Sequence, residues 1–520
     1  MNGPAQLVWF KRDLRVEDHR PLTEAARRGP VVCLYVYESE LHGSVEFTAA
    51  HLVFLNESLR SLDRSLRELD GSLVLRRGKL PEVLHDLRRE VDFAGLWSHE
   101  ETGSDLTYRR DREVGAWCRE QGIPWTEFRQ DGVVRRLASR NGWSRHWEEF
   151  VRESVSPLPG IRGVDGVESV GFLTPEDLDL PATDKLDAQK GGQEEARRTL
   201  ASFLTERGVN YRAEMSSPVT GWTACSRISP YLAFGCISLR TVVAQLGERR
   251  ISLRAAQAAG AAVDRRWFGS LQSFGSRLRW HCHFMQKLED EPRIEFVNFV
   301  RAYDGLREEF TAGPEGRLRF EAWKEGITGY PMVDACIRCV KATGWLNFRM
   351  RAMLASFSAY HLWLHWREPA VWLGSHFLDF EAGIHFSQFQ MQSGTSGINT
   401  VRIYSPAKQA LEQDPDGEFI RRWVPELRDV PLSWLAKPEQ MPEEIQSRCG
   451  CVIGRDYPSP IVDHATAVKE ARERIAAVRR KTETRTEAKK VFVRHGSRKR
   501  PAKRPAAKNQ QPTLPGLTLS

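Results

Sequence analysis

The first 130 residues alternate short apolar runs with amphipathic stretches, and this alternation constrains the fold more than any other feature of the sequence. Five apolar runs have strand character and lie at residues 6–10, 31–37, 72–78, 93–100 and 123–129. The segments between them carry apolar side chains at three- and four-residue spacing, which predicts helices at 21–28, 48–69, 80–90 and 106–121. Regular strand–helix alternation predicts a doubly wound parallel sheet, so we expect an α/β domain over residues 1–131.

Beyond this domain the sequence changes character twice. Residues 132–193 are rich in Pro, Gly and Asp and predict a long connector on the surface. Residues 194–440 contain long apolar stretches of helical period, which predict an all-α domain. Residues 441–478 predict a helical extension that ends in an amphipathic helix at 464–480. No Gly-x-Gly-x-x-Gly follows the first strand, so a dehydrogenase-type nucleotide site is unsupported, although the carboxyl edge of the sheet remains a natural ligand crevice.

The positive charge of the chain is concentrated at its end. The formal net charge is +8, yet residues 479–508 alone contain 13 Lys and Arg against 2 acidic residues. We therefore expect residues 479–520 to form a disordered basic tail that binds nucleic-acid phosphates without sequence preference. The candidate DNA contacts in this tail are Arg498, Lys499, Arg500, Lys503 and Arg504. A tail that only solubilises the chain is the alternative.

Composition also limits the cellular environments in which we expect the protein. No apolar run approaches the roughly 18 residues that would span a bilayer, and the first ten residues do not have the pattern of a secretion signal. Nine cysteines in 520 residues are too sparse for a disulfide scaffold. We expect a soluble, cytoplasmic monomer that does not bind membranes.

Two segments carry candidate chemistry. CSRIS at residues 225–229 places hydroxyl groups at a helix start, where they either cap the helix or hold a phosphate. The other segment, residues 344–394, is the most apolar part of the chain and yet contains charged side chains, namely Arg349, Arg351, Asp379 and Glu381. Buried charges persist when they are paired or contact a ligand, and at this point both explanations stay open.

Several motifs, in order, resemble those of the DNA photolyase/cryptochrome family. WFKRDLRVEDHRPL resembles the first strand and helix of the family, with His19 where Asn is usual. CSRISPYLAFGCIS resembles its flavin-phosphate segment, AWKEGITGYPMVDACIRCVKATGWLNFRMRAMLASF its central flavin-binding helices, and IYSPAKQALEQDPDGEFIRRWVPEL its closing block. The match covers residues 6–130 and 200–434. The resemblance implies FAD bound in the helical domain and, in some members, a second antenna chromophore in the α/β domain.

The resemblance also assigns roles to individual residues. The residues implied to bind FAD are Tyr211, Cys225, Ser226, Arg227, Ile228, Ser229, Arg351, Asp379, Glu381 and His385, with Cys225 replacing the usual Thr. Trp280 matches the tryptophan at the mouth of the flavin cavity, where it contacts DNA together with Arg349. Arg351 and Asp379 match the pair beside the isoalloxazine ring, and a cation there favours anionic reduced flavin.

Departures from the family pattern cluster around the expected lesion pocket. Arg277 stands where repair enzymes for cyclobutane dimers have a glutamate, and His385 stands where the flavin N5 neighbour is usually Asn. Because histidine titrates near neutrality, His385 is expected to exchange a proton there. Met391 and Phe389 replace tryptophans, so only Trp366, the middle member, remains of the usual electron chain. These departures indicate that the chain resembles a divergent member of the family. The catalytic candidates that the resemblance implies are Arg277, Trp280, His385 and Met391.

The sequence leads to three alternative hypotheses about function. The leading hypothesis is a light-driven repair enzyme, a carbon–carbon lyase that reverses ultraviolet-induced pyrimidine lesions in DNA by electron transfer from photoexcited reduced FAD. The alternative is a cryptochrome-like blue-light photoreceptor without repair activity, and a third is a nucleic-acid-binding protein that has lost flavin. We predict no metal centre, because the spacing of Cys336, Cys339, Cys449 and Cys451 does not suit an iron–sulfur cluster.

Overall fold

Five parallel strands form one sheet in the order β3-β2-β1-β4-β5 in the computed structural model, which describes residues 3–183, 185 and 187–496. The strands are β1 (Ala5–Phe10), β2 (Val31–Tyr37), β3 (Leu73–Arg77), β4 (Phe93–His99) and β5 (Trp125–Phe128). The order reverses at β1, which pairs with β2 on one side and β4 on the other. All five predicted strands and the doubly wound topology are confirmed.

Helices cover both faces of this sheet, as its buried strands require. They are α1 (Arg20–Ala26), α2 (Ser39–His42), α3 (Ala49–Arg67), α4 (Leu80–Glu90) and α5 (Asp105–Glu120). Successive residues of β1 point to opposite faces: Val8 packs in the core that includes α3, and Leu7 packs in the core formed with α4 and α5. On the α3 face, Phe54 contacts Phe234 of the helical domain, with ring centroids 4.9 Å apart. The α/β domain therefore shares one of its cores with the helical domain.

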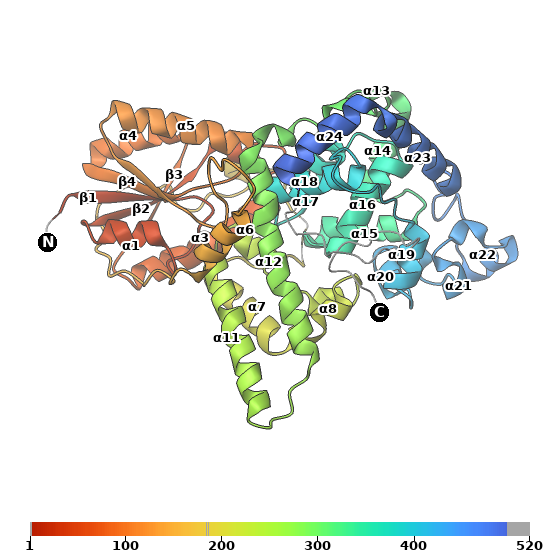
Figure 1. Cartoon of the computed structure of the whole chain (residues 1–520), viewed down its shortest axis with the longest axis horizontal. Helices are drawn as coiled ribbons and strands as arrows, with labels where there is room; N and C mark the ends of the chain where they lie inside the picture. The colour runs from red at the N-terminus through yellow and green to blue at the C-terminus, as the bar shows by residue number, and fades with distance from the viewer. Residues whose placement is uncertain (1–2, 184, 186, 497–520) are drawn as a thin grey trace.

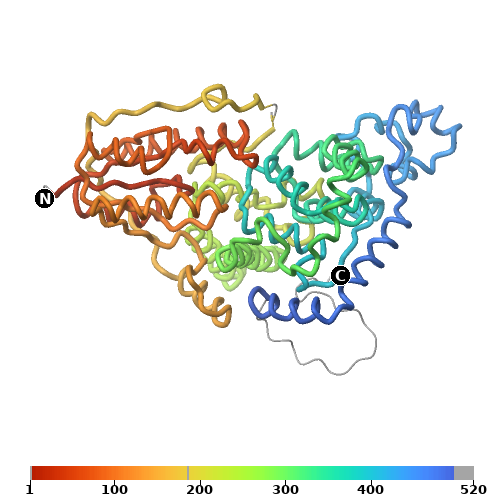
Figure 2. Tube along the Cα trace, turned by 90° about the horizontal axis from the view of Figure 1, so that it is seen from above, coloured from red at the N-terminus to blue at the C-terminus, as the bar shows by residue number. Residues whose placement is uncertain are grey.

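The connector after β5 runs along the surface, as Figure 2 shows in yellow. It contains α6 (Trp143–Arg152) and the short helix η1 (Glu176–Leu178). The sequence analysis did not expect a helix here, yet Trp143, Trp147 and Phe150 of α6 are all buried. Trp143 donates a hydrogen bond to Gln286 on α12, which fixes the connector to the helical domain.

The second half of the chain is helical, and the two halves lie side by side in Figure 1. Its helices are α7 (Gln193–Thr205), η2 (Arg207–Asn210), α8 (Tyr211–Glu214), α9 (Gly221–Ala224), α10 (Ser229–Ala233), α11 (Leu239–Ala258), α12 (Arg266–Asp290), η3 (Pro292–Glu295), η4 (Arg301–Tyr303), α13 (Glu308–Ala312), α14 (Pro314–Glu325), α15 (Pro331–Thr343), α16 (Phe348–Ser356), η5 (Phe357–His361), α17 (Arg367–His376), α18 (Ala382–Ser393), α19 (Pro406–Gln413), α20 (Glu418–Trp423), η6 (Pro425–Leu427), α21 (Leu432–Leu435) and η7 (Pro438–Gln440). The longest of them, α12, runs between the two halves and packs against α18.

The C-terminal part differs from the prediction. After α22 (Glu443–Cys449) and the predicted helix α23 (His464–Arg480), the chain forms a further helix, α24 (Thr482–His495). The expected disordered tail over 479–520 is therefore wrong for residues 479–495, and the rest of that tail lies outside the described residues.

The reason is a narrow apolar face within a charged segment. Thr484, Val491 and His495 of α24 are buried, although most of the charged residues between them are exposed. Both carboxylate oxygens of Glu487 accept backbone N–H groups at the start of η4, from Arg301 at 2.8 Å and from Ala302 at 3.0 Å. Counting charges over this segment concealed the seven- and four-residue spacing of the buried positions, which places them on one helix face.

Acidification is expected to loosen α24 from the helical domain. The Nε2 atom of His495 bonds to Glu291 at 2.7 Å, and burial lowers the pKa of His495. The folded state therefore resists protonation of His495, and α24 loses stability as the pH falls below about 6.5. Burial opposes ionisation of Glu291, but hydrogen bonds from His495 and Arg293 lower its pKa from 4.5 to about 2. The contribution of Glu291 to the stability of α24 is therefore complete above pH 4.5 and is lost as the pH falls towards 2.

Hydrogen exchange of the α24 amides measures this effect. After correction for the intrinsic pH dependence of amide exchange, we expect lower protection factors at about pH 5 than at about pH 7, and His495→Gln should remove this first step while leaving the loss at lower pH. Equal protection of α24 across this range in the wild type would contradict the prediction.

Among the residues that the structure describes, no helix combines the length and the apolar character needed to cross a lipid bilayer.

Candidate functional site

A bidentate ion pair joins α16 to the segment that precedes α18. The Nη1 and Nη2 atoms of Arg351 each donate to one oxygen of Asp379 at 2.9 Å, and Nε donates to the Leu346 carbonyl at 2.8 Å. The guanidinium also lies 3.9 Å from the ring centroid of Phe377. Burial tends to raise the pKa of Asp379, but the charge and hydrogen bonds of Arg351 and a bond from Ser229 lower it below its ordinary value. The predicted pair is therefore a fixed, ionised unit.

The α/β domain helps to position Asp379. The Nη2 atom of Arg12, from the loop after β1, donates to the Phe380 carbonyl at 2.9 Å. His51 of α3 bonds through Nε2 to the Phe377 carbonyl at 3.0 Å. Sequence reasoning missed both contacts, because nothing local in either segment indicates a partner more than 300 residues away.

The predicted phosphate segment is a loop whose backbone carbonyls accept hydrogen bonds from a partly buried arginine. Arg207 donates to the carbonyls of Thr223 at 2.9 Å and of Ser226 at 2.6 Å, and also to that of Cys225. Ile228 is buried, and Ser229 is the first residue of α10. The hydroxyl of Ser229 is thereby brought to Asp379, whereas the sequence alone could not distinguish capping from ligand binding.

Arg227 adopts a left-handed backbone conformation, with φ at 58°, and its guanidinium contacts two indole rings that pack edge to face against each other. The Trp222 and Trp345 ring centroids are 4.2 and 4.0 Å away, and Nε donates to Gln189 at 3.0 Å. Burial lowers the pKa of Arg227 to about 10, so it remains a cation at neutral pH. Contacts with these two rings fix the position of the Arg227 charge at the site.

Arg277 on α12 joins the same neighbourhood. It hydrogen-bonds the Tyr211 hydroxyl, and its guanidinium lies 5.3 Å from the ring centroid of Phe348. Burial raises the pKa of the Cys225 thiol to about 12, although Arg227, Arg277 and other nearby guanidiniums act in the opposite direction. Tyr211 and Cys225 are therefore close together, as the predicted FAD site requires, and Arg277, a predicted lesion-pocket residue, lies beside them.

The residues at this site fit an anionic cofactor. Within the described part of the chain, Nη1 of Arg227 and Nε of Arg349 are buried donors without a hydrogen-bond partner. Buried polar groups are usually paired, so the open Nη1 of Arg227, whose charge acts on Asp379, suits phosphate oxygens of a bound molecule. The diphosphate of FAD has this chemistry.

Glu381 does not pair with Arg351. Its Oε2 atom lies 2.8 Å from Nε2 of His281 on α12. Burial opposes protonation of His281, but the Glu381 carboxylate raises its pKa well above the ordinary value. Both side chains line a pocket between the carboxyl edge of the sheet and the helical domain, together with Arg12 and Asp131. The predicted cofactor residue Glu381 thus reaches this interdomain pocket.

His385 lies in an aromatic environment. Its Nε2 atom bonds to the Ala370 carbonyl at 2.7 Å, and its ring centroid is 5.3 Å from that of Phe380 and 4.9 Å from that of Phe389. Burial lowers the pKa of His385 to about 4. The expectation that it exchanges a proton near neutral pH is therefore wrong for this structure, because desolvation disfavours the imidazolium.

The remaining predicted residues lie on α12, on α18 and directly before α17. Trp280 is partly exposed, and its ring contacts His283 and Phe284. Trp280 precedes His281, which bonds Glu381 at one end of the α12–α18 contact. Met391 follows Gln390, which bonds the Ile294 carbonyl at the other end of that contact. Trp280 and Met391, the two expected lesion contacts, therefore lie at opposite ends of the α12–α18 contact.

Trp366 is fully buried, and its Nε1 atom donates to Asn298 at 2.8 Å. Its ring centroid lies 6.1 Å from that of Phe386. Cys336 and Cys339 are buried on α15, while Cys449 and Cys451 lie at the end of α22, and among the described residues these four do not form a metal-binding group. The structure thus gives no support to an iron–sulfur cluster at these cysteines.

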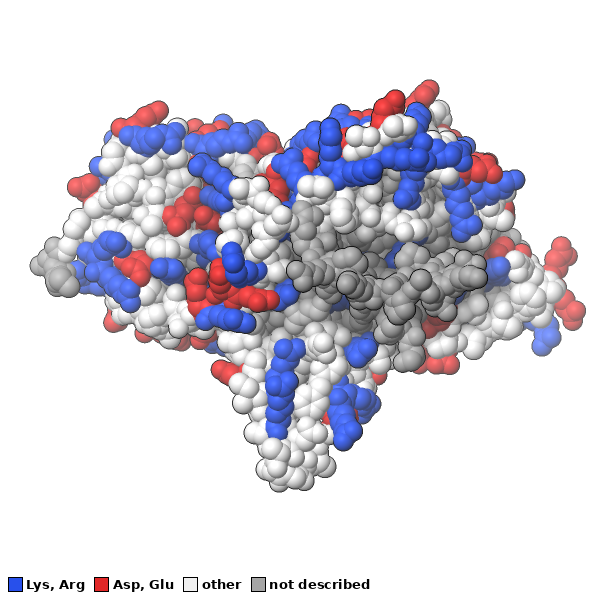
Figure 3. Space-filling view, in the orientation of Figure 1, with Lys and Arg blue, Asp and Glu red and all other residues white. Residues whose placement is uncertain are grey.

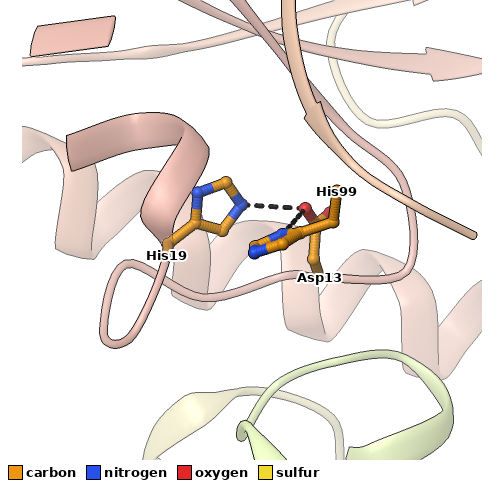
Figure 4. A group of neighbouring side chains, drawn as sticks. All are labelled: Asp13, His19 and His99. Carbon is orange, nitrogen blue, oxygen red and sulfur yellow. Dashed lines mark hydrogen bonds and ion pairs between the residues drawn. The ribbon is translucent and has the colours of Figure 1, made fainter. Parts of the chain in front are cut away.

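A second buried cluster lies where the strand order reverses, at the carboxyl ends of β1 and β4. Oδ2 of Asp13 accepts from His19 at 2.8 Å and from His99 at 2.7 Å (Figure 4). Burial and neighbouring charges lower the pKa of His19, and burial lowers that of His99 to about 3. Both histidines are therefore neutral donors, and the cluster holds the loop after β1 against the sheet.

Comparison with known proteins places both halves of the chain. Residues 6–141 match the family model described as DNA photolyase, and residues 274–477 match the FAD binding domain of DNA photolyase. A curated relative, cryptochrome DASH of Gloeobacter violaceus, is 28% identical, and the match covers 91% of this chain and 96% of the relative. Curated relatives include proteins named photolyase and proteins named cryptochrome at similar identity.

Solved structures agree with this result. A bacterial class III photolyase from Agrobacterium tumefaciens superposes with a TM-score of 0.79 at 25% identity, covering 92% of this chain and 98% of that structure. An archaeal photolyase from Sulfolobus tokodaii, solved with two FAD molecules, superposes with a TM-score of 0.71 at 23% identity, covering 91% of this chain and all of that one. The second likeness concerns the fold alone.

Proposed function

Because this chain belongs to the DNA photolyase/cryptochrome family, we propose that it is a flavin-dependent enzyme that uses light to reverse ultraviolet-induced pyrimidine lesions in DNA. The observation that carries the proposal is the cationic site built around the Arg351–Asp379 pair, with an open buried donor, Nη1 of Arg227, beside it. Reduced FAD, when bound there, supplies on excitation by blue light the electron that splits the lesion.

The chain's own residues bind and orient this cofactor. Ser226, Ser229 and Arg227 are proposed to hold the diphosphate, since their segment joins hydroxyl groups, a helix start and a fixed cation. Arg351 is proposed to hold the flavin ring through its positive charge, and the aromatic rings around His385 keep water from the same side.

Contact with DNA is proposed for a surface that includes Trp280. Its partly exposed indole ring can stack on a base that has left the duplex, and the adjacent Arg277 carries a positive charge. Figure 3 shows Lys and Arg gathered in a band over α23 and α24. The exposed cations of these helices are Lys469, Arg472, Arg474, Arg479, Arg480, Lys481, Arg485, Lys489, Lys490 and Arg494. Such a band attracts the phosphate backbone without reading sequence.

A photoreceptor without repair activity is the second candidate. It is favoured by Arg277, which is committed to Tyr211 and stands where a dimer-binding glutamate is expected, and by Phe389, which stacks on His385 where the usual chain has a tryptophan. Relatives named cryptochrome are as similar as those named photolyase.

A repair assay separates the two candidates. The purified, flavin-containing protein is mixed with duplexes that carry one defined cyclobutane dimer or one (6-4) lesion, and the loss of each lesion is followed in blue light and in the dark. We expect loss of one lesion only in the light. Retention of both lesions, with flavin present and reduced, would replace the repair proposal by the photoreceptor.

The basic end of the chain is proposed to add unspecific affinity. Residues 497–520 lie outside the described structure, but residues 498–508 contain six Lys and Arg. Deleting residues 497–520 should weaken binding to damaged and undamaged duplexes alike and reduce the slope of log K against log salt by up to about 5, or about 0.9 per neutralised phosphate. Titrations at several salt concentrations measure this slope. An unchanged slope would show that the tail does not touch DNA.

We also propose a cytoplasmic location, in keeping with nine cysteines that are all free, and an antenna chromophore in the α/β domain. The interdomain pocket at the carboxyl edge of the sheet supports the second proposal.

A further inference from the structure

The wall of the interdomain pocket contains a cluster of three different metal-ligating side chains. Asp131, from the loop after β5, and His281 and Cys282, from α12, each offer one ligand atom, and these atoms lie within 4.8 Å of one another. We propose that this cluster binds a divalent transition metal of the zinc class, with three protein ligands and one exchangeable position. The sequence analysis predicted no metal centre from the spacing of four other cysteines, and it had no signal for Asp131 and the His-Cys pair, which are 150 residues apart.

The orientation of His281 supports this proposal. Its Nε2 atom is bonded to the Glu381 carboxylate at 2.8 Å, so Nδ1 is the atom that faces Cys282. Histidine ligands in metal sites characteristically donate their second N–H to a carboxylate, which fixes the ring and makes it a better ligand. Glu381 holds His281 in this way before any metal is bound.

The distances suit a tetrahedral ion. Zinc binds thiolate sulfur at about 2.3 Å and imidazole nitrogen at about 2.0–2.1 Å, which places these two ligand atoms about 3.6 Å apart at a tetrahedral angle. Sγ of Cys282 lies 3.8 Å from Nδ1 of His281. A weak hydrogen bond between these two atoms occupies this distance in the protein without metal. Binding would replace it, and the protons on Sγ and Nδ1 would pass to solvent.

The other two ligands are also held from outside the cluster. Oδ1 of Asp131 accepts the Val133 backbone N–H at 2.7 Å, which orients the carboxylate. The backbone N–H of Gly132 bonds to the sulfur of Cys282. These backbone hydrogen bonds hold both ligand groups in place at the cluster.

The Asp13 cluster shows why these features matter. His19 and His99 both bond the same Oδ2 atom, and Nδ1 of His19 accepts the Leu22 backbone N–H at 3.1 Å. The Nε2 atom of His19 therefore carries the proton and cannot ligate a metal. That cluster is a closed hydrogen-bond network, whereas Nδ1 of His281 faces a thiol and a carboxylate.

The exchangeable position faces the pocket. Asp131 and His281 line it, together with Arg12 and Gln130, while Cys282 is fully buried behind them. A water molecule or an oxygen donor of a molecule in the pocket would complete the coordination. Three protein ligands with one open position is the arrangement of zinc sites that bind a further ligand.

Cobalt provides a spectroscopic test, since it occupies zinc sites and reports thiolate ligation. Full-length, FAD-containing protein is treated with a chelator, dialysed and titrated with Co²⁺ in the dark without DNA. We expect one Co²⁺ per chain, with tetrahedral ligand-field bands at wavelengths beyond the flavin absorption and a thiolate-to-cobalt charge-transfer band. The flavin content of each sample is measured separately, so loss of the cofactor or failure of the repair proposal cannot be mistaken for loss of the metal.

Three variants and a control test the ligands. Cys282→Ser should abolish the charge-transfer band, and Asp131→Asn should weaken binding by more than about 100-fold, beyond the roughly 10- to 100-fold loss expected for Glu381→Gln as an outer partner. Cys118→Ser removes another buried helical thiol and should leave the titration unchanged. A charge-transfer band that survives in Cys282→Ser, or wild-type protein that takes up no tetrahedral cobalt, would overturn the proposal. If Cys282→Ser does not fold, unchanged binding by Asp131→Asn would overturn it equally.

Discussion

Replacing Arg351 by Ala is expected to give a protein that purifies almost without FAD. The substitution removes both hydrogen bonds to Asp379 and leaves a carboxylate that is only 5% exposed without its cation. Breaking a buried pair in this way costs about 3–5 kcal/mol, and partial exposure of the arginine places the expected loss of unfolding free energy near about 3 kcal/mol. It also removes a charge that the cofactor site requires. The flavin-to-protein absorbance ratio and urea unfolding measure the two effects.

The chain offers a matched control in Arg338. Its Nη1 atom contacts both carboxylate oxygens of Glu426, at 2.9 and 2.8 Å, and neither residue is among those predicted to bind the cofactor. Arg338→Ala should cost less stability, because that pair is more exposed, and should retain normal flavin content. Equal flavin content in Arg351→Ala and wild type would show that the cofactor residues are wrongly assigned.

Replacing Trp280 by Ala is expected to remove most of the preference for damaged DNA. A flipped base loses its stacking partner, and stacking on an aromatic ring contributes about 1–3 kcal/mol per base, so affinity for a damaged duplex should fall by about 10- to 100-fold. Affinity for an undamaged duplex should remain nearly unchanged, since that binding depends on phosphate contacts. Competition titrations with matched duplexes measure the ratio, and light-driven lesion loss should fall in parallel.

Trp434→Ala is the corresponding control, because Trp434 is also partly exposed and lies in the short helix α21. That variant should keep the wild-type ratio. If Trp280→Ala weakens binding to both duplexes equally, Trp280 serves general affinity, and lesion recognition lies elsewhere.

The cofactor site was predictable to the extent that its residues lie in contiguous motifs. Ser229 and Arg351 stand in segments whose pattern is visible in the sequence, and the structure brings them to Asp379. By contrast, Arg207 and Trp222 have no local signal, yet they fix the phosphate segment and Arg227. Their roles depend on which helices the fold places next to one another.

The protonation states of buried groups could not be predicted from the sequence. Histidine at position 385 predicted a group that exchanges protons near neutrality, but burial among aromatic rings lowers its pKa to about 4. Glu381 matched a flavin ligand by position, yet its longer side chain reaches His281. Residue type sets the range of chemistry, whereas desolvation and neighbours set the protonation state.

The sequence by itself determined the elements and their order, because strand and helix periods are local properties of hydrophobic spacing. Five strands, the long helices and the parallel topology all follow from residues within about 20 positions of one another. Only the tertiary structure decided that Thr482–His495 folds as α24, that Glu381 pairs with His281, and that Asp131 meets Cys282. Each of these contacts joins segments at least 100 residues apart, and their energies arise from burial and charge pairing that exist only after the domains have packed together.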